Sequence, residues 1–186
     1  MRAEESLDEK LMDIIIEERL DNALDDALQK DAGYQQSEQL KRQKCDRLKE
    51  IGLTEEQWEE VEEALMADNS YCAIYGELAY RQGFQDGVKN MREKPEGTIP
   101  DVISRQELNA ILGDVFQKDT GYQQSERLKR KKCNRLRKIK LTEEQWGEVE
   151  KALMADSAYC AIYGEIAYQQ GFQDGAKIML ELKRLV

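Results

Sequence analysis

The chain contains the same segment twice. Residues 29–91 align with residues 117–179 at a constant offset of 88 without a gap, and 48 of the 63 aligned positions are identical. Self-similarity at a long fixed period constrains the fold more than any other feature, because both copies must be able to adopt the same structure. The period exceeds that of common solenoid repeats, which favours a small helical unit in each copy over one turn of a superhelix.

Composition and the two prolines indicate the fold class and the domain boundary. Apolar residues make up 40% of the chain and charged residues 35%, a profile typical of long, charge-coated helices. We therefore predict an all-α protein. Both prolines lie in the segment Pro95–Pro100, which we interpret as a linker. The expected organisation is a first helical repeat at 1–94, a linker at 95–100 and a second helical repeat at 101–186.

Each repeat is expected to hold three helices. Apolar spacing predicts an amphipathic first helix over about 5–29, and a shorter counterpart that begins at the capping box Ser104–Glu107. Glycines at positions 33 and 121 indicate helix stops, so the second helices are expected over about 34–50 and 122–138.

The third helix of each repeat is expected to begin at a second capping box, Thr-x-x-Gln, at Thr54 and Thr142. In the first repeat it should run unbroken to about Arg92. The connection before it is only a few residues long, so we expect the second and third helices of each repeat to form an antiparallel hairpin.

Glycines in the third helices predict a packing seam. A glycine inside a helix costs about 1 kcal/mol relative to alanine, so three in each copy require a packing or functional reason. A seam of small residues lets another helix approach closely, and the two repeats would then pack through their third helices as a pseudo-dimer. Leucine in the seam should destabilise the protein strongly, and alanine much less. The seam residues are Gly76, Gly83, Gly87, Gly164, Gly171 and Gly175.

The same segment carries a resemblance to known proteins. A Leu-Thr-Glu-Glu-Gln hairpin followed by a helix with the pattern aromatic-x-x-Gly-Phe-x-x-Gly-x-x-x-Met resembles a family of small all-helical proteins from bacteria, phages and mobile elements. The pattern occurs at Leu53–Gln57 with Tyr80–Met91, and again at Leu141–Gln145 with Tyr168–Met179. The resemblance covers most of each copy, implies a helical fold and brings no established activity.

No residue pattern predicts an enzyme, a metal site or a cofactor site. The sequence contains no histidine, which removes the most common general base and metal ligand. Paired carboxylates, for example Glu77 with Asp86 or their copies Glu165 with Asp174, are the remaining catalytic option, but such acids are usually solvated surface charge. The four cysteines lack metal-site spacing, so we expect buried free thiols more than a four-thiolate metal site. They are Cys45, Cys72, Cys133 and Cys160.

Charge distinguishes the two repeats. The net charge of the whole chain is −10, with −12 in residues 1–93 and +2 in residues 94–186. Nine of the 14 residues in 127–140 are basic, and a helix this basic is attracted to the phosphate backbone of nucleic acids. The alternative, which we favour, is that this basic helix faces the acidic start of the third helix within its hairpin. The basic residues considered for partner binding are Arg127, Lys129, Arg130, Lys131, Lys132 and Arg135.

The function expected from these patterns is a non-enzymatic protein-interaction module. We expect a phage or mobile-element protein that binds and modulates a host protein in the cytoplasm. It would act as a monomer with internal pseudo-two-fold symmetry or as a homo-oligomer, and no membrane segment is expected. Alternatives are a nucleic-acid-associated protein acting through 127–140 and an acidic nucleic-acid mimic that inhibits a host defence nuclease. Further partner-binding positions considered, with core packing the more common role for the tryptophans, are Glu55, Glu56, Trp58, Glu59, Glu62 and Trp146.

Overall fold

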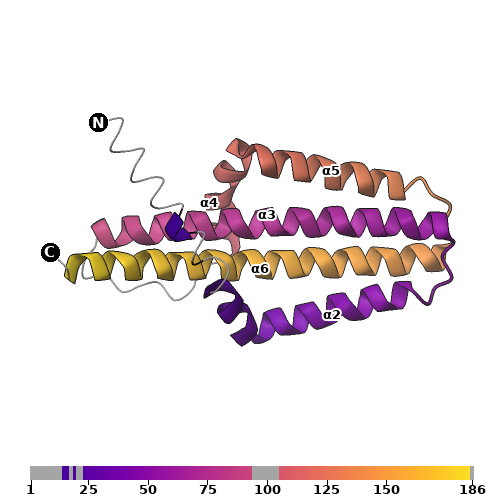
Figure 1. Cartoon of the computed structure of the whole chain (residues 1–186). Helices are drawn as coiled ribbons and strands as arrows, with labels where there is room; N and C mark the ends of the chain where they lie inside the picture. The colour runs from indigo at the N-terminus through magenta and orange to yellow at the C-terminus, as the bar shows by residue number, and fades with distance from the viewer. Residues whose placement is uncertain (1–13, 17–18, 20–22, 94–104, 185–186) are drawn as a thin grey trace.

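Every secondary-structure element in the described part of the chain is a helix, as the sequence predicts. The computed structural model describes residues 14–16, 19, 23–93 and 105–184 (Figure 1). The helical residues 23–30 precede α2. The elements that follow are α2 (Ala32–Leu48), α3 (Glu55–Glu93), α4 (Arg105–Lys118), α5 (Thr120–Leu136) and α6 (Glu143–Arg184). The linker 95–100, the capping box residue Ser104 and much of the expected helix over 5–29 lie outside the described residues.

The capping boxes before the long helices are confirmed. The Gln57 amide N–H donates to Thr54 Oγ1 at 3.2 Å, and the Thr54 amide N–H donates to Gln57 Oε1 at 2.9 Å. Thr142 and Gln145 make the same reciprocal pair. Two exposed amides are satisfied at each helix start, and α3 then continues without a break to Glu93.

The glycines expected to stop the first helices lie instead inside the next helices. Asp31 interrupts the helical backbone, and its Oδ1 accepts from the amide of Tyr34 at 2.7 Å. Asp119 does the same for Tyr122. An N-cap aspartate therefore sets each boundary two residues earlier than the glycine, so the expected helix-stop role of Gly33 and Gly121 is wrong.

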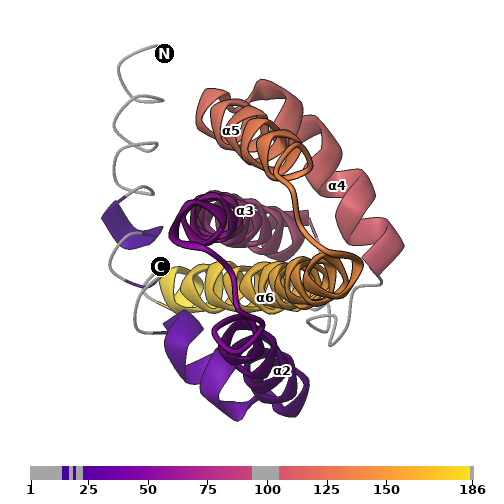
Figure 2. The same cartoon turned by 90° about the vertical axis from the view of Figure 1, so that its right-hand side faces the viewer.

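The expected hairpin between the second and third helices of a repeat is also wrong. Across the molecule, the order of these four helices is α5, α3, α6, α2 (Figure 1). The short helix α2 therefore packs on the long helix α6, and the short helix α5 packs on the long helix α3. The connections at the end of the bundle carry the chain from α2 past α6 to α3, and from α5 past α3 to α6 (Figure 2). Side chains fix the crossing: Gln57 Nε2 donates to the carbonyl of Lys140, and Gln145 Nε2 donates to that of Gly52 at 3.2 Å.

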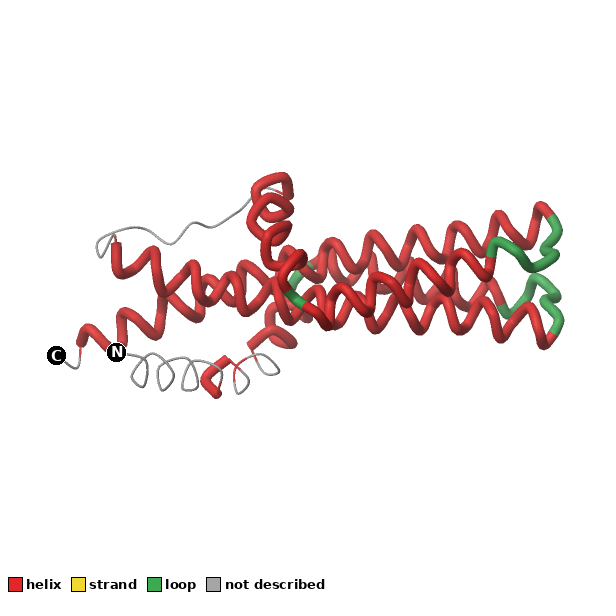
Figure 3. Tube along the Cα trace, turned by 90° about the horizontal axis from the view of Figure 1, so that it is seen from above, coloured by secondary structure: helices red, strands yellow, loops and turns green. Residues whose placement is uncertain are grey.

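Two apolar clusters lie along the bundle. The first, at the end with the connecting loops, contains Leu48, Val61 and Ala64 with their second-repeat equivalents, and Trp58 and Trp146 pack against it. The second surrounds Tyr80 and Phe84, where α4 crosses the long helices and contributes Leu108 and Leu112 (Figure 3). Removal of this apolar surface from water is the main stabilising contribution.

Candidate functional site

The glycine seam lies between α3 and α6. A Cβ atom added to Gly83 would overlap the carbonyl oxygen of Tyr168, and one added to Gly171 would overlap that of Tyr80. Gly87 and Gly175 lie equally close to the carbonyl oxygens of Phe172 and Phe84. Positions in α3 and α6 increase together along these contacts, so the helices run parallel and their backbones touch.

Gly76 and Gly164 have a different part in the same interface. A Cβ atom at Gly76 would collide with the aromatic ring of Tyr163, and one at Gly164 would collide with the ring of Tyr75. These two glycines therefore make room for a tyrosine ring of the opposite long helix. All six glycines of the seam are buried.

The polar residues of the repeated motif bond across the seam. The Tyr80 hydroxyl donates to Asp174 Oδ2 at 2.8 Å, and the Tyr168 hydroxyl donates to Asp86 Oδ2 at 2.9 Å. Burial raises the pKa of both phenols, and the accepting carboxylate raises each pKa further. The phenols are thus fixed as neutral donors. Asp86 and Asp174, considered for catalysis with Glu77 and Glu165, instead hold the two long helices together.

Glu77 and Asp174 also have partners within their own helices. Glu77 accepts from Arg81 Nε at 3.1 Å on the surface of α3. Asp174 is only 3% exposed, and Gln170 Nε2 donates to it at 3.1 Å from one turn away. The geometry therefore gives these acids partners rather than an open reaction centre.

A polar layer separates the two apolar clusters. Asp68 and Asp156, each 1% exposed, pair with Lys129 and Lys41 from the short helices. Burial raises the pKa of the Asp68 carboxyl, although the Lys129 ammonium opposes that shift. A buried acid of this kind is costly unless it is paired, so these two ion pairs help to hold α2 on α6 and α5 on α3.

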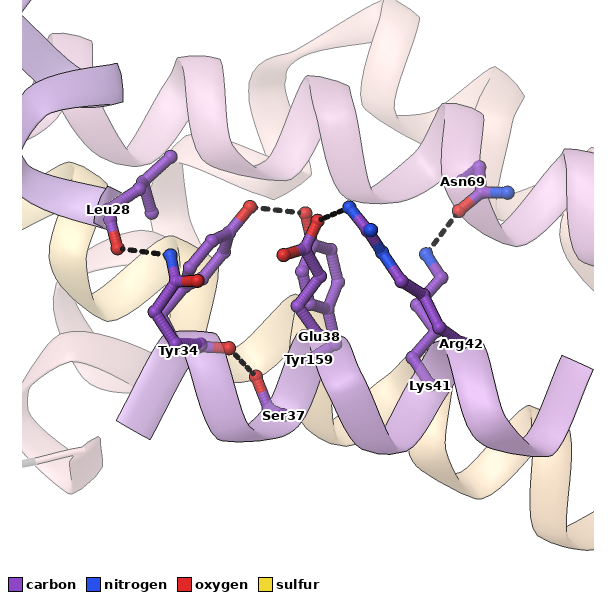
Figure 4. A network of polar contacts seen from close by, with 9 residues as sticks. Leu28, Tyr34, Ser37, Glu38, Lys41, Arg42, Asn69 and Tyr159 are labelled. Atoms are coloured by element: carbon purple, nitrogen blue, oxygen red, sulfur yellow. Dashed lines mark hydrogen bonds and ion pairs between the residues drawn. The ribbon is translucent and has the colours of Figure 1, made fainter. Parts of the chain in front are cut away.

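Aromatic residues surround the same layer. The Tyr34 and Tyr159 hydroxyls lie 2.7 Å apart and join α2 to α6 (Figure 4). Lys41 Nζ lies 4.4 Å from the centre of the Tyr159 ring and donates to Asn69 Oδ1 at 2.5 Å. Tyr71 and Tyr122 form the equivalent contact between α3 and α5, at 2.6 Å.

The cysteines do not form a metal site in the described residues. All four are free thiols, and no group of three or more metal-ligating side chains of His, Cys, Asp or Glu gathers in this part of the chain. Cys72 and Cys160 are buried and hydrogen-bond to each other between α3 and α6. That bond and burial raise the pKa of Cys72, which disfavours the reactive thiolate. Cys45 and Cys133 are half-buried on α2 and α5.

Three cations of the basic helix pair with acids on α3, and we call them the inward cations; Lys129 and Lys132 are largely buried, whereas Arg135 is 59% exposed. Besides Lys129, Lys132 Nζ pairs with Glu63 Oε2 at 2.7 Å, and Arg135 pairs with Glu60 Oε1 at 2.5 Å. These acids lie on α3 of the first repeat. The internal neutralisation expected within one hairpin therefore occurs between the two repeats, because α5 packs on α3.

The other cations of the basic segment face solvent. Arg130 pairs with Glu126 of its own helix at 2.7 Å, whereas the remaining ones have no carboxylate within ion-pair distance among the described residues. We call the exposed set the outer basic face. Its members are Arg127, Arg130, Lys131, Arg137, Lys138 and Lys140.

The equivalent surface on α2 carries fewer cations, although Arg42 and Lys49 match Arg130 and Arg137. At the positions of Arg127, Lys131 and Lys138, the first repeat carries Gln39, Gln43 and Glu50, which are also exposed. Because α2 and α5 lie on opposite sides of the molecule (Figure 2), two equivalent surfaces differ in charge.

The acidic and aromatic positions considered for partner binding fall into two groups. Trp58 and Trp146 are half-buried beside the loop-end apolar cluster, which matches core packing more than an exposed anchor. The four acidic positions are exposed near the start of α3: Glu55, Glu56, Glu59 and Glu62.

Sequence reasoning missed the buried acids and the Tyr-Asp bonds. Asp68 lies one position after Ala67 and four before Cys72, within a stretch of small residues, and an acid on such a face is a detectable signal of a buried ion pair. The sequence gives no indication of which helix pairs with each buried acid or tyrosine, because α3 and α6 carry nearly the same residues.

Comparisons with protein-family models, with curated proteins and with solved structures found no match. Within the described residues, no helix combines the length and the apolar character needed to cross a bilayer. The resemblance of the glycine motif to phage and mobile-element proteins stays a prediction.

Proposed function

We propose that the chain is a non-enzymatic protein-interaction module built as a fused pseudo-dimer. The observation that carries this proposal is the use of the motif in assembly: Tyr80 bonds to Asp174, Tyr168 bonds to Asp86, and the glycines bring the two backbones together. The polar residues of the motif that could serve in chemistry bond to each other across the interface between α3 and α6. What remains for function is the outer surface.

The pseudo-dimer is supported by the pairing of the helices. Each short helix packs on the long helix of the other repeat, and the two long helices pack on each other. A single repeat in this arrangement would leave its glycine face and its buried acid without partners. We infer that a single-copy ancestor formed the same assembly as a symmetric dimer, and that duplication joined the subunits.

The surface favours a role in binding, with the two repeats serving different partners or different parts of one partner. The substitutions that distinguish the outer faces of α2 and α5 alter charge and leave the internal contacts in place. Following the resemblance of the glycine motif, we propose that the protein belongs to a phage or mobile element and binds a host protein in the cytoplasm.

Site-specific photocrosslinking in host cells tests this function. A photoreactive amino acid is placed at exposed positions on three helices, one variant each: Gln43 of α2, Glu62 of α3 and Lys131 of α5. We expect a discrete protein adduct from at least one position, and a complex that re-forms from the purified components. If none of the positions gives an adduct that can be reconstituted, the proposal of an interaction module fails.

Nucleic-acid association is a second candidate function, because the outer basic face is exposed and largely unpaired. The exposed acids at the start of α3 would serve the alternative of a nucleic-acid mimic directed at a defence nuclease. Neither candidate uses the three inward cations, which already neutralise Asp68, Glu63 and Glu60.

A further inference from the structure

Apart from the Arg130–Glu126 pair, the charge of the outer basic face has no ion-pair partner among the described residues. Arg127 and Lys131 are one helical turn apart on the solvent side of α5, and Lys138 and Lys140 continue the cations beyond the helix end at Leu136. The inward cations of the same helix are used by α3, so the two sets are separable by substitution. From Arg127 to the C-cap residue Arg137, the outer set extends over about 15 Å, at about 1.5 Å per helical residue.

A hollow flanks this face. A cavity of about 310 Å³ lies between α3 and α5, and Arg130, Asn134 and Arg137 of the outer side line it together with Tyr71. On the other flank, Leu128 is 45% exposed. Charged donors, an aromatic wall and an exposed apolar side chain thus occur on one short surface.

We propose that the outer basic face binds a short acidic segment of a partner protein, with carboxylates pairing to Arg127, Lys131 and Lys138. This inference rests on the proposed interaction function and names the surface and the chemistry of the partner. Exposed cations on one helix attract carboxylates and raise the association rate, with an effect that salt weakens.

The surroundings of the face favour a short acidic protein segment over nucleic acid. Duplex DNA carries about one negative charge per 1.7 Å of its axis, so it would extend beyond a face of this length. At the loop end it would meet the exposed carboxylates of Glu59 and Glu62 on α3, the helix that α5 contacts. The exposed Leu128 can contact an apolar side chain of a protein partner, and a phosphate backbone has no such side chain.

The pseudo-symmetry of the molecule supplies matched variants. The loss variant, R127Q/K131Q/K138E, gives α5 the residues that α2 carries at the same positions. The gain variant, Q39R/Q43K/E50K, gives α2 the outer cations of α5. All six positions are exposed, so both variants keep the internal packing; equal thermal unfolding curves check this.

Fluorescence anisotropy with two probes tests the proposal. The probes are a labelled helical peptide with glutamates four, three and four residues apart and a leucine beside them, and a labelled short DNA duplex. We expect the peptide to bind the wild-type protein at one site, about tenfold more weakly in the loss variant, and at two sites in the gain variant.

Three results would overturn the proposal. They are peptide binding that the loss variant leaves unchanged, absence of peptide binding to the wild-type protein, and tighter binding of the duplex that the loss variant abolishes. If photocrosslinked adducts form only from α2 or α3, the outer basic face is not the binding surface, but the protein is still an interaction module. The two proposals can therefore fail separately.

Discussion

At the residue scale, Gly83 and Gly171 connect the repeated sequence to the assembly most directly. Each lies against a backbone carbonyl of the other long helix, which cannot move away as a flexible side chain can. Even a methyl group would overlap backbone atoms, so alanine is expected to be destabilising as well, where the sequence alone predicts an effect much smaller than that of leucine.

Gly83→Ala is expected to lower the free energy of unfolding by about 3 kcal/mol, the upper part of the usual range for overpacking, because α3 and α6 must separate. Gly147→Ala is the control. Gly147 lies inside α6 with open space around it, so alanine there should raise stability by about 0.5–1 kcal/mol. Denaturant unfolding measures both. Equal stability of Gly83→Ala and the wild-type protein would show that the helices do not touch at the seam.

We expect the protein to lose stability at high pH, because the pKa values of Tyr80 and Tyr168 are raised in the folded state. The pKa of each phenol is raised above its value of about 10 in the unfolded chain, first by burial and then by Asp174 or Asp86. The stability that these protonated phenols contribute is fully present below about pH 10 and is lost as the pH rises further, by about 1.4 kcal/mol per pH unit for each tyrosine.

Denaturant unfolding from pH 8 to 12 measures this slope, and the Y80F/Y168F variant is the control. The variant should lose less stability between about pH 10 and 12, although it is less stable at neutral pH because Asp174 and Asp86 lose a donor. A slope that is the same in both proteins would contradict the Tyr-Asp bonds.

At the scale of helices, the sequence predicted which segments are helical far better than which helices are partners. Capping residues at Thr54 and Thr142 and the apolar spacing gave the long helices their starts and extents. The choice between packing α2 on α3 or on α6 had no basis in the sequence, since both long helices carry the same acid, at Asp68 and Asp156, and the same glycines. Near-identity of the copies makes the two arrangements equivalent at the level of residue patterns.

The inward and outward cations of α5 predict opposite outcomes on substitution. Lys129→Met should cost about 3–5 kcal/mol, because Asp68 would remain buried without its ion-pair partner. The pKa of Asp68 is already raised by burial and would rise further, so this loss should be largest at neutral pH and shrink on acidification.

Lys131→Gln is the matched control for that substitution, because it removes an exposed charge from the same helix. It should alter stability by no more than about 0.5 kcal/mol. Thermal and denaturant unfolding of the two variants at neutral and mildly acidic pH compare them. Similar effects of both substitutions would mean that Asp68 is not held by α5.

At the scale of the whole molecule, the duplication has produced a symmetric interior and an asymmetric exterior. The seam glycines, the Tyr-Asp bonds and the buried Lys-Asp pairs between the halves occur in matching sets, whereas the outer charges of α2 and α5 differ. Two copies in one chain can differ in this way, whereas a homodimer of a single copy must present the same residues on both faces. Binding of different surfaces by different partners would follow from that freedom.

Cleavage of the chain between the repeats tests the central claim that each repeat packs on the other. A protease site inserted between Gly97 and Thr98 of the full chain is cut under native conditions, and an affinity tag on one half is used for purification and size-exclusion chromatography. Because α2 packs on α6, α5 on α3 and the long helices on each other, both halves should co-purify in equal amounts and elute as the uncut protein does. Separation of the halves into two folded monomers would contradict the account.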